Sequence, residues 1–337
     1  MTRRFKIAIF IMLILGLSAF CSFALNPSSY MRVVFHDVKN NDYDLIFVGQ
    51  SRGETNINPY ILDSYMEYKS YNLCRRFVQL PDIQYVIREA NSNKNVKVVV
   101  YDVDQFYFYN TDIDYYSDAF MYPHITNLSD KLRYTGVLMN KDYRILLMRY
   151  TLEGLDDLRD SKDRIKDKLS QGYKEYSFDA VTNKNTHHIY MGRGYWKGVQ
   201  MSDKTVEGSV WDKEQINKND VALKSLSDMS RYCSDENIIL IAVHAPVPHE
   251  RFTEDEHCDQ KEYFENLFGE YGIKYIDFNF IKEEYLTWDA DGYTDLEGHM
   301  MGEMTDRYSK VLGMVLDEYL KGGDIEKYFS EYPNMGD

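Results

Sequence analysis

Ser51 is the first residue whose type and position suggest chemistry. It lies in the segment DLIFVGQSRGE (Asp44–Glu54), where a short apolar run leads into Gly49 and the serine follows two positions later. The serine is either a nucleophile held at the mouth of a sheet or an ordinary polar residue of a strand-to-helix turn. Because a serine hydroxyl is a weak nucleophile near neutral pH, catalysis requires a histidine that takes its proton and an acid that orients the histidine.

His299 is the histidine with the most suitable neighbours. It lies in YTDLEGHMMGEMTDRYS (Tyr293–Ser309), together with Asp295 and Glu297, in a loop that directly precedes the last predicted helix. A loop at the end of a sheet can present an acid and a histidine together. The alternative is a loop whose acids favour the positive end of the following helix, and spacing alone favours that alternative.

The other histidines are weaker candidates. His187 and His188 are adjacent, so on an extended segment they point to opposite faces and cannot both serve one site. His244 ends a predicted buried strand, where it either lines the pocket or satisfies its backbone neighbours. His249 and His257 lie in an acidic loop and are interpreted as solvated.

The elements that must position these residues follow an alternating pattern. Buried-strand patterns occur at Asp44–Gly49, Val96–Val103, Ile238–Pro246 and Lys274–Phe280. Helical patterns occur from Asn58 and Pro59, from Asp82, over Val221–Cys233, up to Gly272 and over Asp306–Gly323. Such alternation predicts an α/β fold with a parallel sheet and active groups at the carboxyl ends of its strands. The alternation of strand and helix patterns is lost over residues 104–218. We predict this segment to be an insertion or lid on a domain of residues 44–330.

The N-terminus predicts a membrane anchor. Residues 1–6 are rich in arginine and lysine, and Ile7–Leu25 contains no charged residue. A helix of about 20 apolar residues spans a bilayer core, and the basic flank keeps the N-terminus cytoplasmic. A cleaved signal peptide is the competing interpretation. We expect residues 7–25 to be an uncleaved anchor, residues 26–43 a linker, and the rest of the chain to lie outside the membrane.

Composition excludes several classes of function. The net charge is −15 at pH 7, so a nucleic acid partner is not expected. Three cysteines outside the apolar segment, at scattered positions, do not form a disulfide framework. The chain has no Cys-x-x-Cys or His-x-x-x-His pattern, so neither a metal nor another cofactor is expected.

The order of these motifs resembles the SGNH (GDSL-like) hydrolases. The resemblance is to the membrane-anchored extracytoplasmic branch that includes the D-alanyl-lipoteichoic acid transfer protein and acyltransferase-associated polysaccharide O-acylation proteins. Members typically have one membrane helix, a strand that ends in Gly-x-Ser, a "YNL" segment some twenty residues on, and an acid-histidine pair before the last helix. This chain has Gly49-Gln50-Ser51, Tyr71-Asn72-Leu73, and Asp295 with His299.

The resemblance implies a flavodoxin-like three-layer sandwich and a catalytic triad. Ser51 is then the nucleophile, His299 the general base and Asp295 the orienting acid. The oxyanion and pocket residues implied are Ser51, Asn72, Cys74, Asp102 and Asp104.

Three features depart from the family pattern. The acid usually precedes the histidine by three residues, whereas Asp295 precedes His299 by four, so Glu297 is the alternative orienting acid. Cys74 stands where a glycine is common after "YNL". The segment YDVDQFYF follows the second predicted strand in place of a Gly-x-Asn-Asp block, so an asparagine is missing.

By this resemblance the chain is a cell-membrane serine acyl-transfer enzyme, an O-acyltransferase or esterase. Its substrates would be acyl esters of an envelope or secreted polysaccharide, or of a lipid-linked glycan. Its partner would be a membrane-bound O-acyltransferase. The alternative from another class is a catalytically degenerate SGNH scaffold that binds glycan or that partner.

Overall fold

The computed structural model describes residues 2–25, 31–76, 78–109, 124–141, 161–177, 187–200 and 211–335. The chain forms two compact units. One comprises Met1–His36 and Asp118–Asn183, and the other comprises Asp37–Ser117 and Lys184–Asp337. All residues predicted for the site belong to the second unit.

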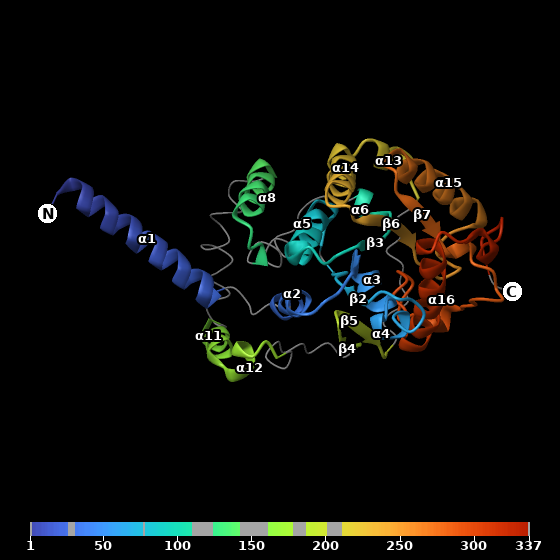
Figure 1. The fold of residues 1–337 in the computed structure, drawn as a ribbon, viewed down its shortest axis with the longest axis horizontal. Helices are drawn as coiled ribbons and strands as arrows, with labels where there is room; N and C mark the ends of the chain where they lie inside the picture. The colour runs from blue at the N-terminus through green and yellow to red at the C-terminus, as the bar shows by residue number, and fades with distance from the viewer. Residues whose placement is uncertain are drawn as a thin grey trace. The chain divides into compact units, whose positions relative to one another are not determined.

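The second unit is built on a five-stranded sheet in which every pair of neighbours is parallel. Its strands are β1 (Leu45–Val48), β2 (Ser70–Asn72), β3 (Val98–Asp102), β6 (Ile239–His244) and β7 (Lys274–Asp277). The order β2-β1-β3-β6-β7 is the flavodoxin-like doubly wound order, in which the chain reverses direction across the sheet at β1. The predicted α/β fold with a parallel sheet is therefore confirmed (Figure 1).

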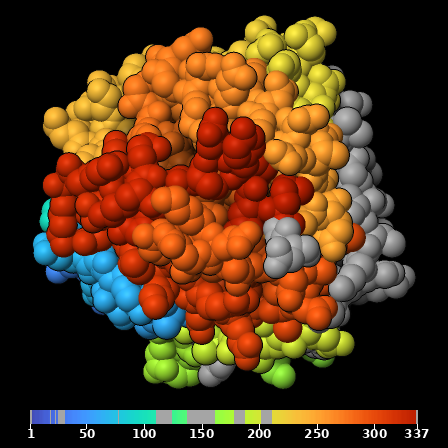
Figure 2. Space-filling model, turned by 90° about the vertical axis from the view of Figure 1, so that its right-hand side faces the viewer, coloured from blue at the N-terminus to red at the C-terminus, as the bar shows by residue number. Residues whose placement is uncertain are grey.

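Helices cover both faces of this sheet. They are α3 (Ser51–Asn56), α4 (Pro59–Leu62), α5 (Leu80–Ala90), α6 (Phe106–Tyr109), α13 (Lys213–Asn217), α14 (Asp220–Asp235), α15 (Glu254–Glu270) and α16 (Gly302–Leu320), with 3₁₀ turns at Asn91–Asn93, Phe278–Phe280, Ala290–Gly292 and Glu326–Tyr328. Helix α16 packs against α3 and α4, while α14 lies beside α5 and α15 contacts β7. The C-terminal part of the chain, coloured orange to red, forms most of the face shown in Figure 2.

Successive side chains of each strand point to opposite faces of the sheet, so each face packs against its own layer of helices. One set of strand side chains joins a fully buried cluster with α16: Leu45, Phe47, Val98, Val100, Ile241, Val243, Leu312, Val315 and Leu316. The alternate set faces the other layer, where the Phe268 ring of α15 stacks on Tyr275 with centroids 5.5 Å apart and meets Tyr101 edge-on at 6.1 Å. Each buried Leu, Val or Phe side chain contributes about 1.5–3 kcal/mol to stability.

Local signals set several helix starts. The Asn58 side chain caps α4 by accepting from the Tyr60 N–H, with Pro59 at the first helical position as predicted. Helix α5 begins earlier than the sequence suggested: Asp82 is the third helical residue of a capping box, and its carboxylate accepts from the Gln79 N–H at 2.9 Å. Gly272 follows α15 with φ of +68°, which favours glycine.

Several elements were not expected from the sequence. Part of the predicted linker forms α2 (Met31–Asn40), whereas residues 26–30 lie outside the described residues. Strand β2 coincides with the "YNL" segment. The predicted insertion contributes an antiparallel hairpin to the second unit, β4 (His188–Gly192) and β5 (Tyr195–Gly198). Much of the remaining insertion (residues 110–123, 142–160, 178–186 and 201–210) lies outside the described residues.

The first unit contains a long N-terminal helix. Its helices are α1 (Arg3–Leu25), α8 (Leu128–Lys141), α11 (Ser161–Leu169) and α12 (Gln171–Lys174). The Arg3–Cys21 part of α1 is long and apolar enough to cross a membrane. Near the end of this helix, the Lys168 Nζ of α11 donates to the Phe23 carbonyl at 2.5 Å.

Gly53 tests how tightly α3 packs on the sheet. A methyl group at Gly53 would lie 2.8 Å from Cys74 Cβ and 3.0 Å from an Asp102 carboxylate oxygen. We therefore expect Gly53→Ala to lower the free energy of unfolding by about 1–3 kcal/mol, because a packed core resists added volume. Thermal unfolding of the detergent-solubilised chain measures the change. Gly269→Ala is the matched control, since nothing lies within 4 Å of that methyl position; equal effects of the two changes would contradict the packing.

Candidate active site

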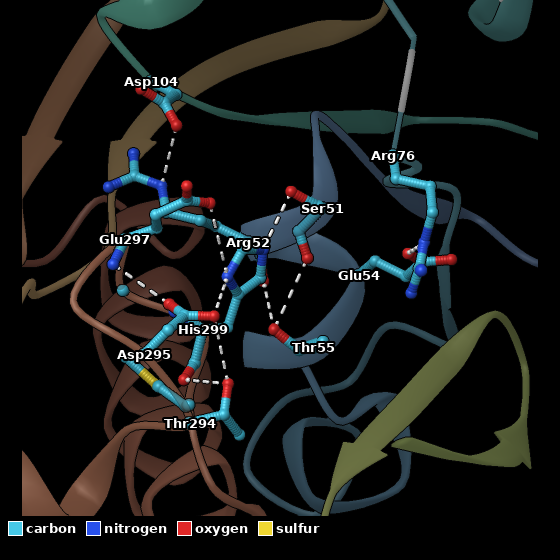
Figure 3. Close-up of polar contacts among 12 residues, drawn as sticks. Ser51, Arg52, Glu54, Thr55, Arg76, Asp104, Thr294, Asp295, Glu297 and His299 are labelled. Atoms are coloured by element: carbon cyan, nitrogen blue, oxygen red, sulfur yellow. Dashed lines mark hydrogen bonds and ion pairs between the residues drawn. The ribbon is translucent and has the colours of Figure 1, made fainter. Parts of the chain in front are cut away.

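Ser51, His299 and Asp295 form a hydrogen-bonded chain (Figure 3). Ser51 is the first residue of α3, directly after β1, and His299 lies on the loop before α16. The His299 Nε2 lies 2.8 Å from Ser51 Oγ, and Nδ1 lies 2.8 Å from Asp295 Oδ2. Because Nδ1 faces a carboxylate, it carries the ring proton, which leaves Nε2 to accept from the serine hydroxyl. This arrangement allows His299 to take the Ser51 proton.

Asp295 is better placed than Glu297 to orient the histidine. The Glu297 carboxylate lies 4.0 Å from His299 Nδ1, and its side chain is 57% exposed. Burial opposes ionisation of Asp295, but its hydrogen bond with His299 and the His299 and Glu297 backbone N–H groups lower its pKa below the ordinary value. Asp295 is therefore ionised at neutral pH. The backbone turns at Gly298, between Asp295 and His299, so that an acid four residues before the histidine can reach its ring. The φ of Gly298 is +100°, a value that favours glycine.

Asn56 holds the loop that carries His299. It is fully buried at the last position of α3, and its amide donates to the Gly298 carbonyl at 2.9 Å. Its Oδ1 accepts from the Met300 N–H at 2.8 Å. The two peptide groups on either side of His299 are thus fixed to the helix that begins with Ser51. No motif in the sequence marks Asn56 for this role.

Arg52 and Asp104 anchor α3 to the carboxyl end of β3. The Arg52 side chain is 2% exposed; its Nε lies 3.0 Å from Asp104 Oδ2, and its Nη2 donates to the Val103 carbonyl at 2.7 Å. Burial opposes ionisation of Asp104, but the Arg52 and Arg251 guanidinium groups lower its pKa. Asp104 therefore serves as the counter-ion of a buried arginine.

Asn72, a predicted oxyanion donor, uses its side chain in hydrogen bonds to the backbone. Its amide donates to the Gly53 and Ile57 carbonyls, and its Oδ1 accepts from the Cys74 N–H. Asn72 and Cys74 are each 1% exposed, and burial raises the pKa of the Cys74 thiol well above its ordinary value. These residues support the turn under Ser51. The Ser51 N–H, in the first turn of α3, has no acceptor among the described residues and remains the candidate oxyanion donor.

Asp102 is buried beneath the same turn. Its side chain is fully buried at the end of β3, close to the positions that methyl groups at Gly49 and Gly53 would occupy. Burial raises the pKa of Asp102 to about 7, against the opposing effect of Arg52. Asp102 therefore does not present a carboxylate to solvent, contrary to its predicted place in the pocket.

His188 lies beside the catalytic candidate His299. Its ring centroid lies 6.5 Å from that of His299 in an edge-on arrangement. His244 is fully buried beside Tyr275, so it satisfies neighbours and does not line the pocket. The expectation that His249 and His257 are solvated is wrong: His249 stacks on the Trp288 ring, and His257 is 3% exposed.

A cavity of about 540 Å³ borders the backbone that follows His299. Met301, two residues after His299, pairs with Gly198 of β5, and both residues line this cavity. Its charged lining has both signs: Asp289, Asp291, Glu303, Lys197 and Arg307. Such a lining suits a polar ligand. Within the described ranges, no group of three or more His, Cys, Asp or Glu residues is arranged to hold a metal ion.

Comparison with known proteins gives no family. No protein-family model matches the chain, and no curated protein matches it in sequence. The geometry of the site therefore carries the functional interpretation.

Asn56 provides a test of how His299 is positioned. Asn56→Ala leaves the Gly298 carbonyl and the Met300 N–H without their partner, so we expect a loss of about 1–3 kcal/mol in stability. A displaced histidine also slows serine attack, so the rate of fluorophosphonate labelling at Ser51 should fall about tenfold or more. Asn95→Ala, at an exposed asparagine before β3, is the control. Wild-type labelling by folded Asn56→Ala would show that Asn56 does not position His299.

Asp102 predicts a pH dependence of stability. Its pKa is raised to about 7 from an ordinary 3.8, so the folded state binds this proton more tightly than the unfolded state does. The free energy of unfolding should therefore fall as pH rises from about 4 to about 7, by up to about 4 kcal/mol. Asp102→Asn, which cannot ionise, should lack this fall. Denaturant unfolding of both proteins at pH 5 and pH 8 measures it; parallel curves would refute the assignment.

Proposed function

We propose that this protein is a membrane-anchored serine acyl-transfer enzyme that acts on acyl esters of cell-envelope or secreted polysaccharide. The observation that carries the proposal is the continuous chain Asp295–His299–Ser51, with 2.8 Å at each step. Nucleophile, base and orienting acid are the three roles that acyl transfer by serine requires.

The reaction follows from this geometry. Ser51 Oγ attacks the acyl carbonyl while His299 Nε2 takes the hydroxyl proton, and Asp295 stabilises the imidazolium. The Ser51 N–H donates to the developing oxyanion, where one such donor contributes on the order of 3 kcal/mol. His299 then protonates the leaving alcohol, which leaves an acyl-serine. A second hydroxyl or water gives its proton to His299 and attacks the ester; His299 then returns the proton to the departing Ser51 Oγ, which restores the serine hydroxyl and the neutral imidazole.

An SGNH-type fold is part of the same proposal. It is supported by the flavodoxin-like strand order, by the serine after β1 and by an acid and histidine directly before α16. The N-terminal apolar helix, with Arg3, Arg4 and Lys6 at its start, supports a single-pass anchor and a catalytic unit outside the membrane. There it would meet glycopolymers, lipid-linked carriers and a membrane-bound O-acyltransferase that delivers acyl groups.

One observation favours a second candidate, a glycan- or partner-binding scaffold without chemistry. Side chains expected at the oxyanion hole and in the pocket are used elsewhere, because Asn72 holds the turn and Asp104 pairs with Arg52. The aligned Ser51 and His299 favour the enzyme, since a binding scaffold does not need that hydrogen bond.

Fluorophosphonate labelling of the full-length chain in detergent separates the two candidates. We expect Ser51→Ala to abolish labelling, and His299→Ala and Asp295→Asn to slow it at least a hundredfold. Glu297→Gln should stay within about twofold of wild type, because that carboxylate is exposed and distant from the ring.

Absence of labelling in wild type would favour the binding scaffold. If labelling occurs, the dependence of acyl release on an added sugar acceptor distinguishes transferase from esterase.

A further inference from the structure

A second group of charged residues lies on the side of Ser51 away from Asp295 in the view of Figure 3. Glu54, three residues after Ser51 on α3, is fully buried and accepts from Arg75 Nη1 and, at 3.1 Å, from Arg76 Nε. One carboxylate thus faces two guanidinium groups. The group carries one positive charge in excess.

Arg76 presents that excess charge to solvent. The Arg75 side chain is 9% exposed, whereas that of Arg76 is 32% exposed. Arg76 uses its Nε for Glu54, and its terminal nitrogens form no hydrogen bond with the described part of the chain. Because Glu54 fixes one edge of the guanidinium plane, the other edge is preorganised to receive a planar anion.

His188 lies beside His299 and within the electrostatic influence of Arg76. The pKa of His188 is lowered to about 4, first by burial and then by the charges of His299 and Arg76, against the opposite effects of Glu54 and Asp295. His188 is thus within electrostatic range of Arg76 and Glu54, and its ring meets that of His299 edge-on at a centroid distance of 6.5 Å. At neutral pH it is uncharged, so it can hydrogen-bond without adding charge.

We propose that Arg76, with His188 beside it, binds an anionic group that the acylated substrate carries next to its ester. This inference rests on the proposed function and narrows its substrate class to acidic polymers. The chain has a net charge of −15, so a polyanion is repelled at long range and a local cation is needed to hold it. The bound chemistry is a carboxylate or phosphate oxygen, supplied by a uronic acid or by a polyol phosphate.

Three acetylated probes test this substrate class: an oligogalacturonate, a glycerol-phosphate oligomer and a neutral xylo-oligosaccharide. We expect the full-length protein in detergent to release acetate from at least one anionic probe with kcat/KM about tenfold or more above that for the neutral probe at low salt. The preference should shrink as salt is added, because salt screens the charge of the partly exposed Arg76. The better anionic probe identifies the source of the anion.

Variants assign the preference to Arg76. Arg76→Gln should bring the ratio of anionic to neutral kcat/KM close to one, and Arg76→Lys should retain part of it because the charge remains. Arg231→Gln removes an exposed arginine on α14 and should keep the wild-type ratio. Thermal unfolding of each variant checks that it is folded.

Two outcomes overturn the inference: a wild-type ratio of one or less, or an unchanged ratio in folded Arg76→Gln. Binding of the deacetylated oligomers to Ser51→Ala, measured by calorimetry, tests the subsite without catalysis and should weaken about tenfold in the double variant with Arg76→Gln. If Ser51 takes no label but this Arg76-dependent binding persists, the proposed catalysis fails and the anion subsite stands. Labelling without anion preference overturns the subsite alone.

Discussion

The hydrogen bonds from the Asn56 side chain to the loop that carries His299 are the constraint on which the rest of the site depends. Helix α3 has only six residues, with Ser51 at its first position and Asn56 at its last. Through Asn56, this helix fixes the peptide groups on both sides of His299. The distance between Ser51 and His299 is therefore set by this one short helix, although the two residues are 248 positions apart in the chain.

Such a short helix cannot hold its own position, and buried polar groups supply the anchors. Arg52 reaches the end of β3, and the Asn72 amide at the end of β2 donates to the Gly53 and Ile57 carbonyls. Buried charges stabilise only when they are paired, and Asp104 supplies that counter-ion for Arg52. Asp102 forms no ion pair with the described residues, and its burial makes it difficult to ionise. The residues expected to act on substrate here thus act on the framework.

This framework leaves few groups to act on a substrate directly. Ser51 and His299 form the reactive pair, while His188 and Arg76 lie beside it on segments outside α3 and the His299 loop. The division suits an enzyme that handles an extended ligand. In the proposed enzyme the triad would perform one bond exchange, and the flanking residues would select which polymer is presented to it. An N-terminal helix able to span a membrane would keep such a unit close to surface polymers.

The sequence by itself determined the layers and the candidate reactive residues. Buried-strand runs at β1, β3, β6 and β7, and amphipathic helices such as α14 and α16, follow from side-chain periodicity, which is local. Ser51, His299 and Asp295 could be named as a triad because the order of their motifs resembles that of a known family, whereas the spacing around His299 alone favoured an ordinary loop before a helix.

Only the tertiary structure decided the choice of Asp295 over Glu297, the structural use of Asn72 and Asp104, and the positions of Asn56, His188 and Arg76. Each of these depends on contacts between segments far apart in sequence. The strength of a hydrogen bond or ion pair is set by distance, angle and burial, none of which is encoded in residue spacing.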